Sequence, residues 1–431
     1  MKVIIAGASI GGLLSAYRLG KAGHEVIVFD KKNYDELGYD WYDFVWHDFF
    51  DKLDMPDIDI SFFRKNNMSF DIFGYDKILR LNQPEYAREY AVHRKQLSHF
   101  LYKKASGYSR IVLSKNVDSA IIGGDEIKGI VVDGENIYAD LVIDNFGAFS
   151  PLRKHLSERL NIDNESKSKA VMFAYRGIFE KAKNYSAPED DTKCYLRHLG
   201  QDGLSWVNVE ENAIDVLIGR MKSLNADDAE GILSVLKKEN PCIGEKLLAG
   251  GGIYPIPVSY PATKLFYGGY VLLGDSAFMT VPMLGSGIYS SVAAANILCE
   301  TIENGDVSQK NLYVYQRRFY EKLGASFAEL DVVKTFLLNS DISKLIILLK
   351  KGVVDEKDMT DIYNAKPFYY SLKDLIKKAI KGWRHPLLLL KMLGLLLDTG
   401  KIKKIMYKMP KEYDEKKLSA WRQKVRRFFE E

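Results

Sequence analysis

The first 31 residues show the hydrophobic pattern of a strand, a helix and a second strand. The apolar run from Val3 to Ala6 predicts one buried strand, and the run from Glu25 to Phe29, apolar after its first residue, predicts another. Between them, apolar residues recur at helical spacing from Leu13 to Leu19, and this pattern ends at Ala22-Gly23. The chain therefore begins with a predicted parallel β-α-β unit.

The pattern changes twice further along. Four strand-like runs between residues 170 and 219 follow one another without helices, which predicts a separate antiparallel sheet. The run from Val271 to Gly274 predicts a strand that returns to the first sheet, and from about residue 288 the pattern is mainly helical. We predict an α/β protein (α+β overall) with a Rossmann-type nucleotide-binding domain (1–60, 85–160 and 262–325), an inserted antiparallel-sheet domain (61–84 and 161–261) and a helical, basic C-terminal region (326–431).

The turn between the first strand and helix carries candidate chemistry. It reads Gly7-Ala8-Ser9-Ile10-Gly11-Gly12, a dinucleotide fingerprint with Ser9 in place of the second glycine. The helix N-terminus there presents unpaired N–H groups to a pyrophosphate. Asp30 ends the second strand and is placed to accept hydrogen bonds from an unphosphorylated ribose, as in FAD or NAD. The alternative is a strand, turn and helix that bind no ligand.

A second turn suggests a flavin. The strand ending at Leu273 runs into Gly274-Asp275, and Pro282 and the Gly285-Ser286-Gly287 turn follow before a helix from Ile288. Asp275 is placed to bind a ribityl hydroxyl, and the N–H groups of the turn to approach the N1–C2=O edge of a flavin. The alternative is a plain βα turn with an aspartate N-cap.

These two turns together resemble the FAD-dependent hydroxylase and reductase superfamily. Within it, the chain resembles the geranylgeranyl reductase family, above all its archaeal prenyl-lipid reductases, through Gly203–Asn208, Gly251–Pro255 and the closing segment Met409–Arg422. It departs from the family in having no cysteine in 40–43 and in Asn208-Val209, which replaces Phe-Pro. The resemblance places Arg94 at the FAD phosphates and Gly147 near the adenosine. The predicted FAD-binding residues are Gly7, Ser9, Ile10, Gly11, Gly12, Asp30, Lys31, Arg94, Val117, Gly147, Gly274, Asp275, Pro282, Gly285, Ser286, Gly287 and Ile288.

The resemblance implies a flavin enzyme that reduces isoprenoid (geranylgeranyl) C=C bonds of prenyl lipids or prenyl diphosphates by hydride transfer. Such a site should be dry, long and apolar. We predict an aromatic substrate wall of Phe173, Tyr175, Tyr195 and Trp206, and catalytic candidates Tyr42, Asp43 and His47, whose aromatic segment could instead pack in the core. The alternatives are an FAD-dependent monooxygenase of an aromatic or lipid substrate, and a non-catalytic flavin-binding, prenyl-lipid-binding or electron-transfer protein.

Amino-acid composition bears on where the protein is located and what it binds. Cys194, Cys242 and Cys299 are widely spread and form no CxxC pair, so we expect neither disulfides nor a metal site, and a reducing compartment. Because the first predicted strand begins at residue 3 and the fold needs it, we expect no signal peptide. Residues 371–431 hold 17 Lys/Arg and 7 Asp/Glu within a chain of net charge +4.

The leucine run from 386 to 397 is too short to span a bilayer. We predict either peripheral contact of this region with the inner face of the cell membrane or a helix that covers the core. We expect a cytoplasmic monomer that binds no nucleic acid, with ferredoxin, NADH and NADPH all open as electron donors.

Overall fold

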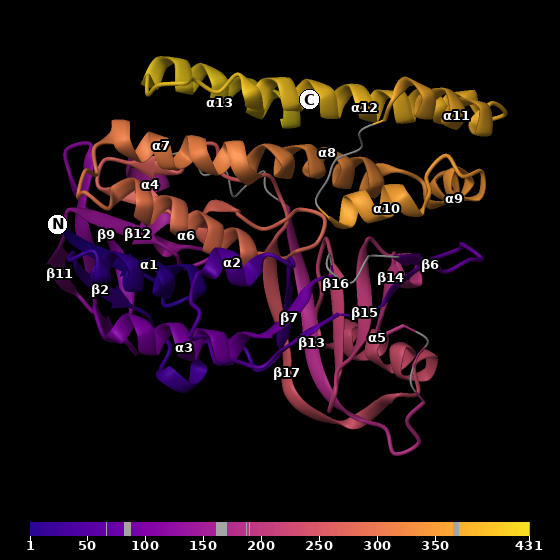
Figure 1. Ribbon diagram of the computed structural model, residues 1–431, viewed down its shortest axis with the longest axis horizontal. Helices are drawn as coiled ribbons and strands as arrows, with labels where there is room; N and C mark the ends of the chain where they lie inside the picture. The colour runs from indigo at the N-terminus through magenta and orange to yellow at the C-terminus, as the bar shows by residue number, and fades with distance from the viewer. Residues whose placement is uncertain are drawn as a thin grey trace.

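The computed structural model describes residues 1–65, 67–81, 88–160, 170–186, 188, 190–364 and 370–430, and two large sheets organise it (Figure 1). The first sheet has the strand order β18-β19-β12-β1-β2-β8. Its central strand β1 (Lys2–Ala6) pairs in parallel with β2 (Glu25–Phe29) and β12 (Leu141–Asp144), and their apolar residues are buried, as a parallel sheet covered on its faces requires. The outer strands are β8 (Arg110–Val112), β18 (Phe266–Tyr267) and β19 (Tyr270–Leu272).

Helices and a small sheet cover this first sheet. Helix α1 (Ile10–Lys21) lies against α3 (Arg94–Ser106) and α6 (Ile288–Ile302). Its predicted apolar face, Leu13 to Leu19, is buried between them. The small sheet consists of β9 (Val117–Gly123), β10 (Glu126–Val132) and β11 (Glu135–Tyr138), and α4 (Pro151–Leu160) packs on β9.

The second sheet has seven strands in the order β17-β13-β16-β15-β14-β5-β6. Its strands are antiparallel except for the pair β14 and β5, which is parallel. The prediction of an antiparallel sheet needs this correction: β5 comes from a distant part of the chain, so no hairpin turn fixes its direction. The bounds are β5 (Met68–Ile72), β6 (Leu79–Leu81), β13 (Val171–Lys181), β14 (Thr192–Leu196), β15 (Gly203–Val209), β16 (Ile214–Arg220) and β17 (Ile243–Pro257), and α5 (Ala226–Glu239) covers one face.

Two parts of the chain, on either side of β5 and β6 in the sequence, come together in a further small sheet. This sheet has the strand order β3-β7-β4 and lies beside the first β-α-β unit. The two parts contain β3 (Tyr42–Val45), α2 (Phe49–Leu53), β4 (Phe62–Arg64) and β7 (Tyr90–His93), which leads directly into α3.

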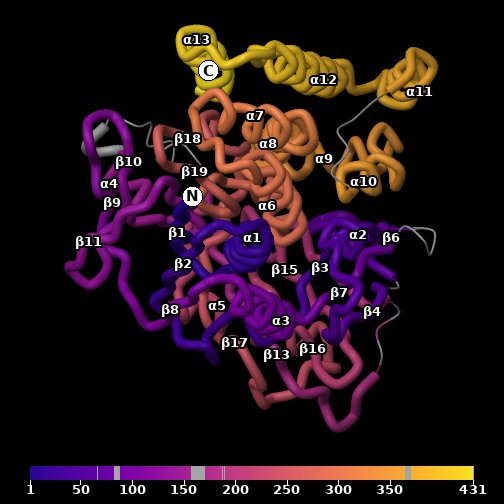
Figure 2. The backbone as a smooth tube through the Cα atoms, turned by 60° about the vertical axis from the view of Figure 1, so that its left-hand side comes forward, coloured from indigo at the N-terminus to yellow at the C-terminus, as the bar shows by residue number. Residues whose placement is uncertain are grey.

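Beyond α6 the described chain is helical, as predicted. The helices are α7 (Gln309–Phe319), α8 (Ala325–Asn339), α9 (Ile342–Lys350), α10 (Glu356–Tyr363), α11 (Leu372–Gly382), α12 (Pro386–Tyr407) and α13 (Glu415–Glu430). Figures 1 and 2 both show α11, α12 and α13 as an outer layer along one side of the molecule.

None of the helices in the described part of the chain is long and apolar enough to cross a membrane. The predicted fold class, a Rossmann-type α/β unit joined to a second sheet and a helical end, is confirmed. The domain boundaries stay a prediction.

Candidate functional site

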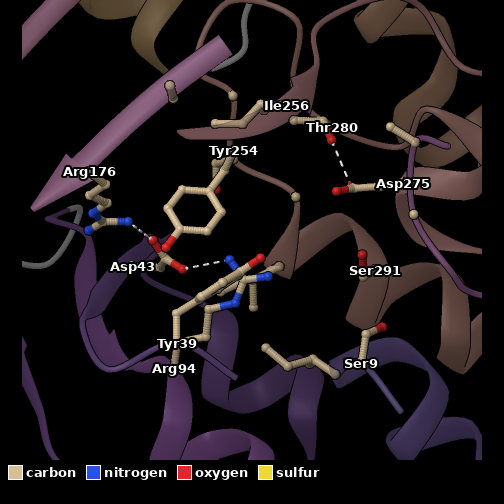
Figure 3. Close-up of a pocket in the computed structure, with 18 of the residues that line it drawn as sticks. Ser9, Tyr39, Asp43, Arg94, Arg176, Tyr254, Ile256, Asp275, Thr280 and Ser291 are labelled. Atoms are coloured by element: carbon tan, nitrogen blue, oxygen red, sulfur yellow. Dashed lines mark hydrogen bonds and ion pairs between the residues drawn. The ribbon is translucent and has the colours of Figure 1, made fainter. Parts of the chain in front are cut away.

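One cavity of about 740 Å³ runs from the Rossmann-type turn to the second sheet. Its volume lies within the range of cofactor and ligand sites, ~300–1,000 Å³. Residues of the β1–α1 turn line one end, and strands β13 to β16 and helix α10 line the other. Figure 3 shows part of this wall, with Ser9 on one side and Arg176 on the other.

The β1–α1 turn is tight, as its glycines predict. Gly7 has a φ of +113°, and a side chain at Gly12 would place its Cβ 2.2 Å from the Gly7 carbonyl oxygen. Only glycine fits such a close approach of helix and strand. Among the described residues, the Ser9 side chain makes no capping bond to α1, and Ile10 and Gly11 at the start of that helix line the cavity, where their N–H groups can face a bound anion.

Asp30 is held at the end of β2. Its two carboxylate oxygens accept the N–H groups of Ala8 (2.7 Å) and Lys32 (2.9 Å). Each oxygen retains a lone pair, and the carboxylate lines the cavity, so it can still accept a ribose hydroxyl.

Asn145 joins the two predicted turns. With its amide oxygen directed at the fingerprint, it accepts hydrogen bonds from the Gly12 N–H (2.7 Å) and the Ser9 hydroxyl, and its amide nitrogen donates to the Leu273 carbonyl (3.1 Å). The end of β1 and the end of β19 therefore meet through one side chain. Asn145 is not among the predicted site residues, although its place just after a buried strand is a usable signal.

Asp275 and the glycine turn after it face the same cavity. The Asp275 carboxylate accepts a hydrogen bond from the Thr280 hydroxyl (2.9 Å), which Figure 3 shows, and burial raises the pKa of this carboxyl against the lowering effect of Thr280 and Arg94. Gly285 has a φ of +67°, and the Ser286 hydroxyl donates to the Phe44 carbonyl (3.1 Å). This turn therefore sits at the boundary between the nucleotide end and the second sheet.

These residues fit an FAD molecule. The glycine cradle, the open helix N-terminus and two carboxylates offer the donors and acceptors that a pyrophosphate, a ribose and a ribityl chain need. Gly12, Gly274 and Pro282 are not among the residues that line the cavity, and the two glycines permit close packing against the Asn145 side chain. The predicted cofactor residues that line the cavity are Gly7, Ser9, Ile10, Gly11, Asp30, Lys31, Arg94, Val117, Gly147, Asp275, Gly285, Ser286, Gly287 and Ile288.

A chain of paired charges crosses the middle of the cavity wall. Asp43 binds Arg94 (3.1 Å) and also Arg176, as the dashed lines of Figure 3 mark. Arg176 reaches on to Asp215 with two hydrogen bonds of 3.0 and 2.8 Å. Its guanidinium lies between the rings of Trp41 and Trp206, 4.9 and 5.5 Å from their centres. This arrangement fixes the segment 41–43 against the second sheet.

Burial and charge act in opposite directions on these groups. Burial alone would raise the pKa of Asp43, but Arg176 and Arg94 hold it below its usual value. Burial raises the pKa of Asp215 by more than Arg176 lowers it. Nearby Glu210 is also buried, and burial with the charge of Asp215 raises its pKa to about 8. Arg176 and Asp215 were missed, although a charged residue inside an otherwise apolar strand pattern is a signal of a buried polar site.

A second polar cluster, Lys65, Glu89 and Tyr363, lies in the substrate half of the wall. The Lys65 ammonium is 3.0 Å from the Tyr363 hydroxyl and 3.7 Å from the Glu89 carboxylate, and Tyr363 donates to Glu89. All three are buried. Burial raises the pKa of Glu89 and lowers that of Lys65, so the neutral pair and the ion pair are closer in free energy than in water. No sequence pattern connects these positions.

The rest of the substrate half is apolar, but the predicted wall needs a correction. Trp206 lines the cavity, whereas Phe173, Tyr175 and Tyr195 belong to the cluster under α5 on the opposite face of the sheet. Side chains alternate along a strand, so their neighbours face the cavity instead. The apolar residues there are Met68, Phe70, Met172, Ala174, Cys194, Leu196, Leu204, Leu217, Met283, Leu284, Met359 and Ile362.

Only one of the three predicted catalytic residues lines the cavity. Asp43 lines the cavity. Tyr42, one residue earlier in β3, turns its ring to Phe63 and His93, and its carbonyl accepts a hydrogen bond from Arg176. His47 is exposed. Tyr42 and His47 therefore lie outside the cavity in this structure.

Comparison with known proteins agrees with this geometry. No protein-family model matches the chain. The digeranylgeranylglycerophospholipid reductase of Sulfolobus acidocaldarius is 24% identical over 98% of this chain and 96% of its own. A geranylgeranyl bacteriochlorophyll reductase-like protein of Thermoplasma acidophilum has the same fold, with a TM-score of 0.72 and 17% identity over 91% of this chain and 98% of its own.

Monooxygenases also resemble the chain. An FAD-dependent monooxygenase of Penicillium thymicola is 24% identical over 76% of this chain and 77% of its own. The p-nitrophenol 4-monooxygenase of Pseudomonas putida shares the fold with a TM-score of 0.61 and 16% identity, over 84% of this chain and 97% of its own.

Fold, site and relatives define the chain as an FAD-dependent oxidoreductase, and the predicted FAD cofactor is confirmed. Within that class the chain is similar to enzymes of geranylgeranyl reductase type. The predicted resemblance to that family is thereby confirmed.

Proposed function

We propose that this enzyme reduces isoprenoid C=C bonds of prenyl lipids. The observation that supports the proposal is the cavity that runs from the two glycine turns to a largely apolar wall on the second sheet. Similarity to a reductase named for a digeranylgeranyl phospholipid supports this substrate class. A peripheral position on the inner face of the cell membrane belongs to the same proposal, because the substrate is a lipid.

The side chains divide the work along the cavity. The α1 N-terminus and Asp30 would hold the pyrophosphate and ribose, and Asp275 the ribityl chain. When bound and in its reduced form, the flavin would supply the hydride. The apolar wall from β13 to β16 excludes water and orients a prenyl chain. Trp206 can stabilise positive charge developing on the alkene by about 1–2 kcal/mol.

Reduction of an isolated double bond also needs a proton. We assign its source to the cluster of Lys65, Glu89 and Tyr363, with the proton held at the Glu89 carboxyl or the Tyr363 hydroxyl. Both groups line the substrate half and are hydrogen-bonded to each other. Glu89→Gln should lower the rate of alkene reduction by about 10²-fold or more and change its pH profile, with the rate of flavin reduction by dithionite unchanged. A full rate in Glu89→Gln would remove this assignment.

The reaction is tested with the flavin-loaded protein under anaerobic conditions. After reduction with dithionite, geranylgeranyl lipids are added, and mass spectrometry should detect gains of two hydrogens. Met359→Trp fills the cavity from α10 and should reduce product at least about tenfold with unchanged flavin content. Lys357→Trp, on the exposed face of the same helix, is the matched control. The absence of any mass gain from lipid, diphosphate and quinone substrates would refute the proposal.

A flavin monooxygenase is the second candidate, favoured by the similarity to the Penicillium enzyme over most of the chain. The two functions differ in how fast the reduced flavin reacts with oxygen. Stopped-flow mixing of the reduced enzyme with air-saturated buffer in the presence of lipid separates them. Slow reoxidation without an oxygenated product supports the reductase, and rapid reoxidation with a product 16 mass units heavier supports the monooxygenase.

A further inference from the structure

The outer face of helices α11 and α12 carries an unbroken row of exposed apolar side chains. Their exposed fractions are large, 75% for Leu372, 67% for Trp383 and 77% for Leu387, for example. The spacing of three and four residues keeps them on one side of each helix. We name this row the outer apolar face; it consists of Leu372, Ile376, Ile380, Trp383, Leu387, Leu390, Leu393 and Leu397.

Helix α12 is apolar on its inner side as well. Leu388, Met392 and Leu395 are buried toward the protein, where α12 packs on α8. Residues 387–397 of α12 are apolar on every side apart from Lys391, and such a helical segment is normally covered all round. In this chain only one side is covered by the described residues, and the other side lies in the outermost layer of the molecule (Figures 1 and 2).

Charge tells which partner fits this face. Between residues 372 and 408 the sequence holds ten Lys/Arg and two Asp/Glu. Exposed Lys373, Lys377, Lys381, Arg384 and Lys391 lie among the leucines. A second copy of the chain on this face would bring these cations against their own counterparts. An anionic surface with an apolar interior satisfies both features.

We propose that the outer apolar face docks on an anionic lipid bilayer. The leucines and Trp383 enter the boundary of headgroups and acyl chains, and the surrounding lysines pair with lipid phosphates. The surface deepens the membrane location that the proposed function includes, and vesicle binding tests it without any substrate.

The docking face is tied to the cavity by a buried ion pair. Lys378 of α11 donates to Asp358 of α10 (2.6 Å) and to the Val353 carbonyl (2.7 Å). On α10, Met359 and Tyr363 line the substrate half of the cavity. Helix α10 therefore stands between the membrane-bound helix and the substrate, and docking places the lipid beside the wall that the substrate must pass.

The test uses the full-length, flavin-loaded protein and 100-nm vesicles in flotation experiments. We expect binding to vesicles that contain phosphatidylglycerol, weakening as salt rises, and at least about tenfold weaker binding to pure phosphatidylcholine. The variant Leu387→Gln/Leu390→Gln should bind phosphatidylglycerol vesicles at least about tenfold more weakly. Leu248→Gln, an exposed leucine on β17, is the matched control and should bind like the parent protein.

A second pair of variants tests the charge. Lys377→Glu/Lys391→Glu should lose binding at low salt, whereas Lys222→Glu/Lys246→Glu, on the second sheet side, should keep it. Wild-type protein that stays free of anionic vesicles at low salt would overturn the proposal. So would a sedimentation-velocity dimer that Leu387→Gln/Leu390→Gln converts to monomer, since the face would then belong to a second copy. Flavin content and the reduction of detergent-dispersed lipid should not change in any of these variants. Because vesicle binding is measured without substrate, a failed reductase assay would not affect its result.

Discussion

Replacing Arg176 by methionine should destabilise the protein far more than an ordinary surface change. Arg176 is the only cation, among the described residues, that hydrogen-bonds to Asp215, and the Asp215 side chain is fully buried. Removal leaves this carboxylate buried and uncompensated, at a cost of about 3–5 kcal/mol. Asp43 loses less, because Arg94 still binds it at 3.1 Å. We therefore expect the free energy of unfolding to fall by about 3–5 kcal/mol.

The measurement is urea denaturation at fixed FAD concentration, followed by tryptophan fluorescence. Arg110→Met, at an exposed position on β8, is the matched control and should change stability by about 0.5 kcal/mol or less. Adding Asp215→Asn to Arg176→Met should recover much of the loss, since no buried charge then remains unpaired. A loss below about 1 kcal/mol for Arg176→Met, or a double variant no more stable than the single one, would refute this account.

Three further predictions concern single positions. Gly12→Ala should abolish FAD retention because the added Cβ would lie 2.2 Å from the Gly7 carbonyl oxygen. The control variant Gly231→Ala in α5, where the space is open, should keep the flavin. The visible absorbance of the purified proteins measures their flavin content. Glu210 has a folded pKa of about 8 against an ordinary value of 4.5, so it binds more protons when folded and stability should fall as pH rises from about 4.5 to about 8, by on the order of a few kcal/mol. In Glu210→Gln that slope should flatten, and equal slopes in both proteins would contradict the assignment. Burial raises the pKa of Cys194 to about 12, so this thiol should resist maleimide at pH 8 until urea unfolds the protein, as mass spectrometry of the labelled peptide will show.

The nucleotide end of the site could be predicted from the sequence because its determinants are local. The turn from Gly7 to Gly12 and the turn from Gly285 to Gly287 each lie between one strand and one helix, so spacing alone indicates their geometry. Most of the predicted FAD-binding residues do line the cavity. Their individual roles stay predictions.

The substrate end could not be predicted as well, for two physical reasons. The first is that the face to which a strand residue points depends on register, so an error of one residue moves every side chain of that strand to the opposite face of the sheet. Neighbouring residues Tyr175 and Arg176 illustrate this, because only Arg176 lines the cavity. The second reason is that the polar groups come from distant segments: Lys65 and Tyr363 are 298 positions apart and meet only after the sheet and α10 have packed. No local pattern records such a contact.

The charged groups in this wall are compatible with an apolar substrate because they are paired. Asp43, Arg94, Arg176 and Asp215 form one chain of alternating sign, and Lys65 and Glu89 form another pair. Each group satisfies its neighbour, so a prenyl chain entering the cavity leaves no charge without a partner. The same pairing holds strand β3 against β13, and β3 is the strand whose Phe44 carbonyl accepts the hydrogen bond from Ser286. The polar chain therefore positions the two halves of the site relative to each other, and the apolar residues between them determine what can bind.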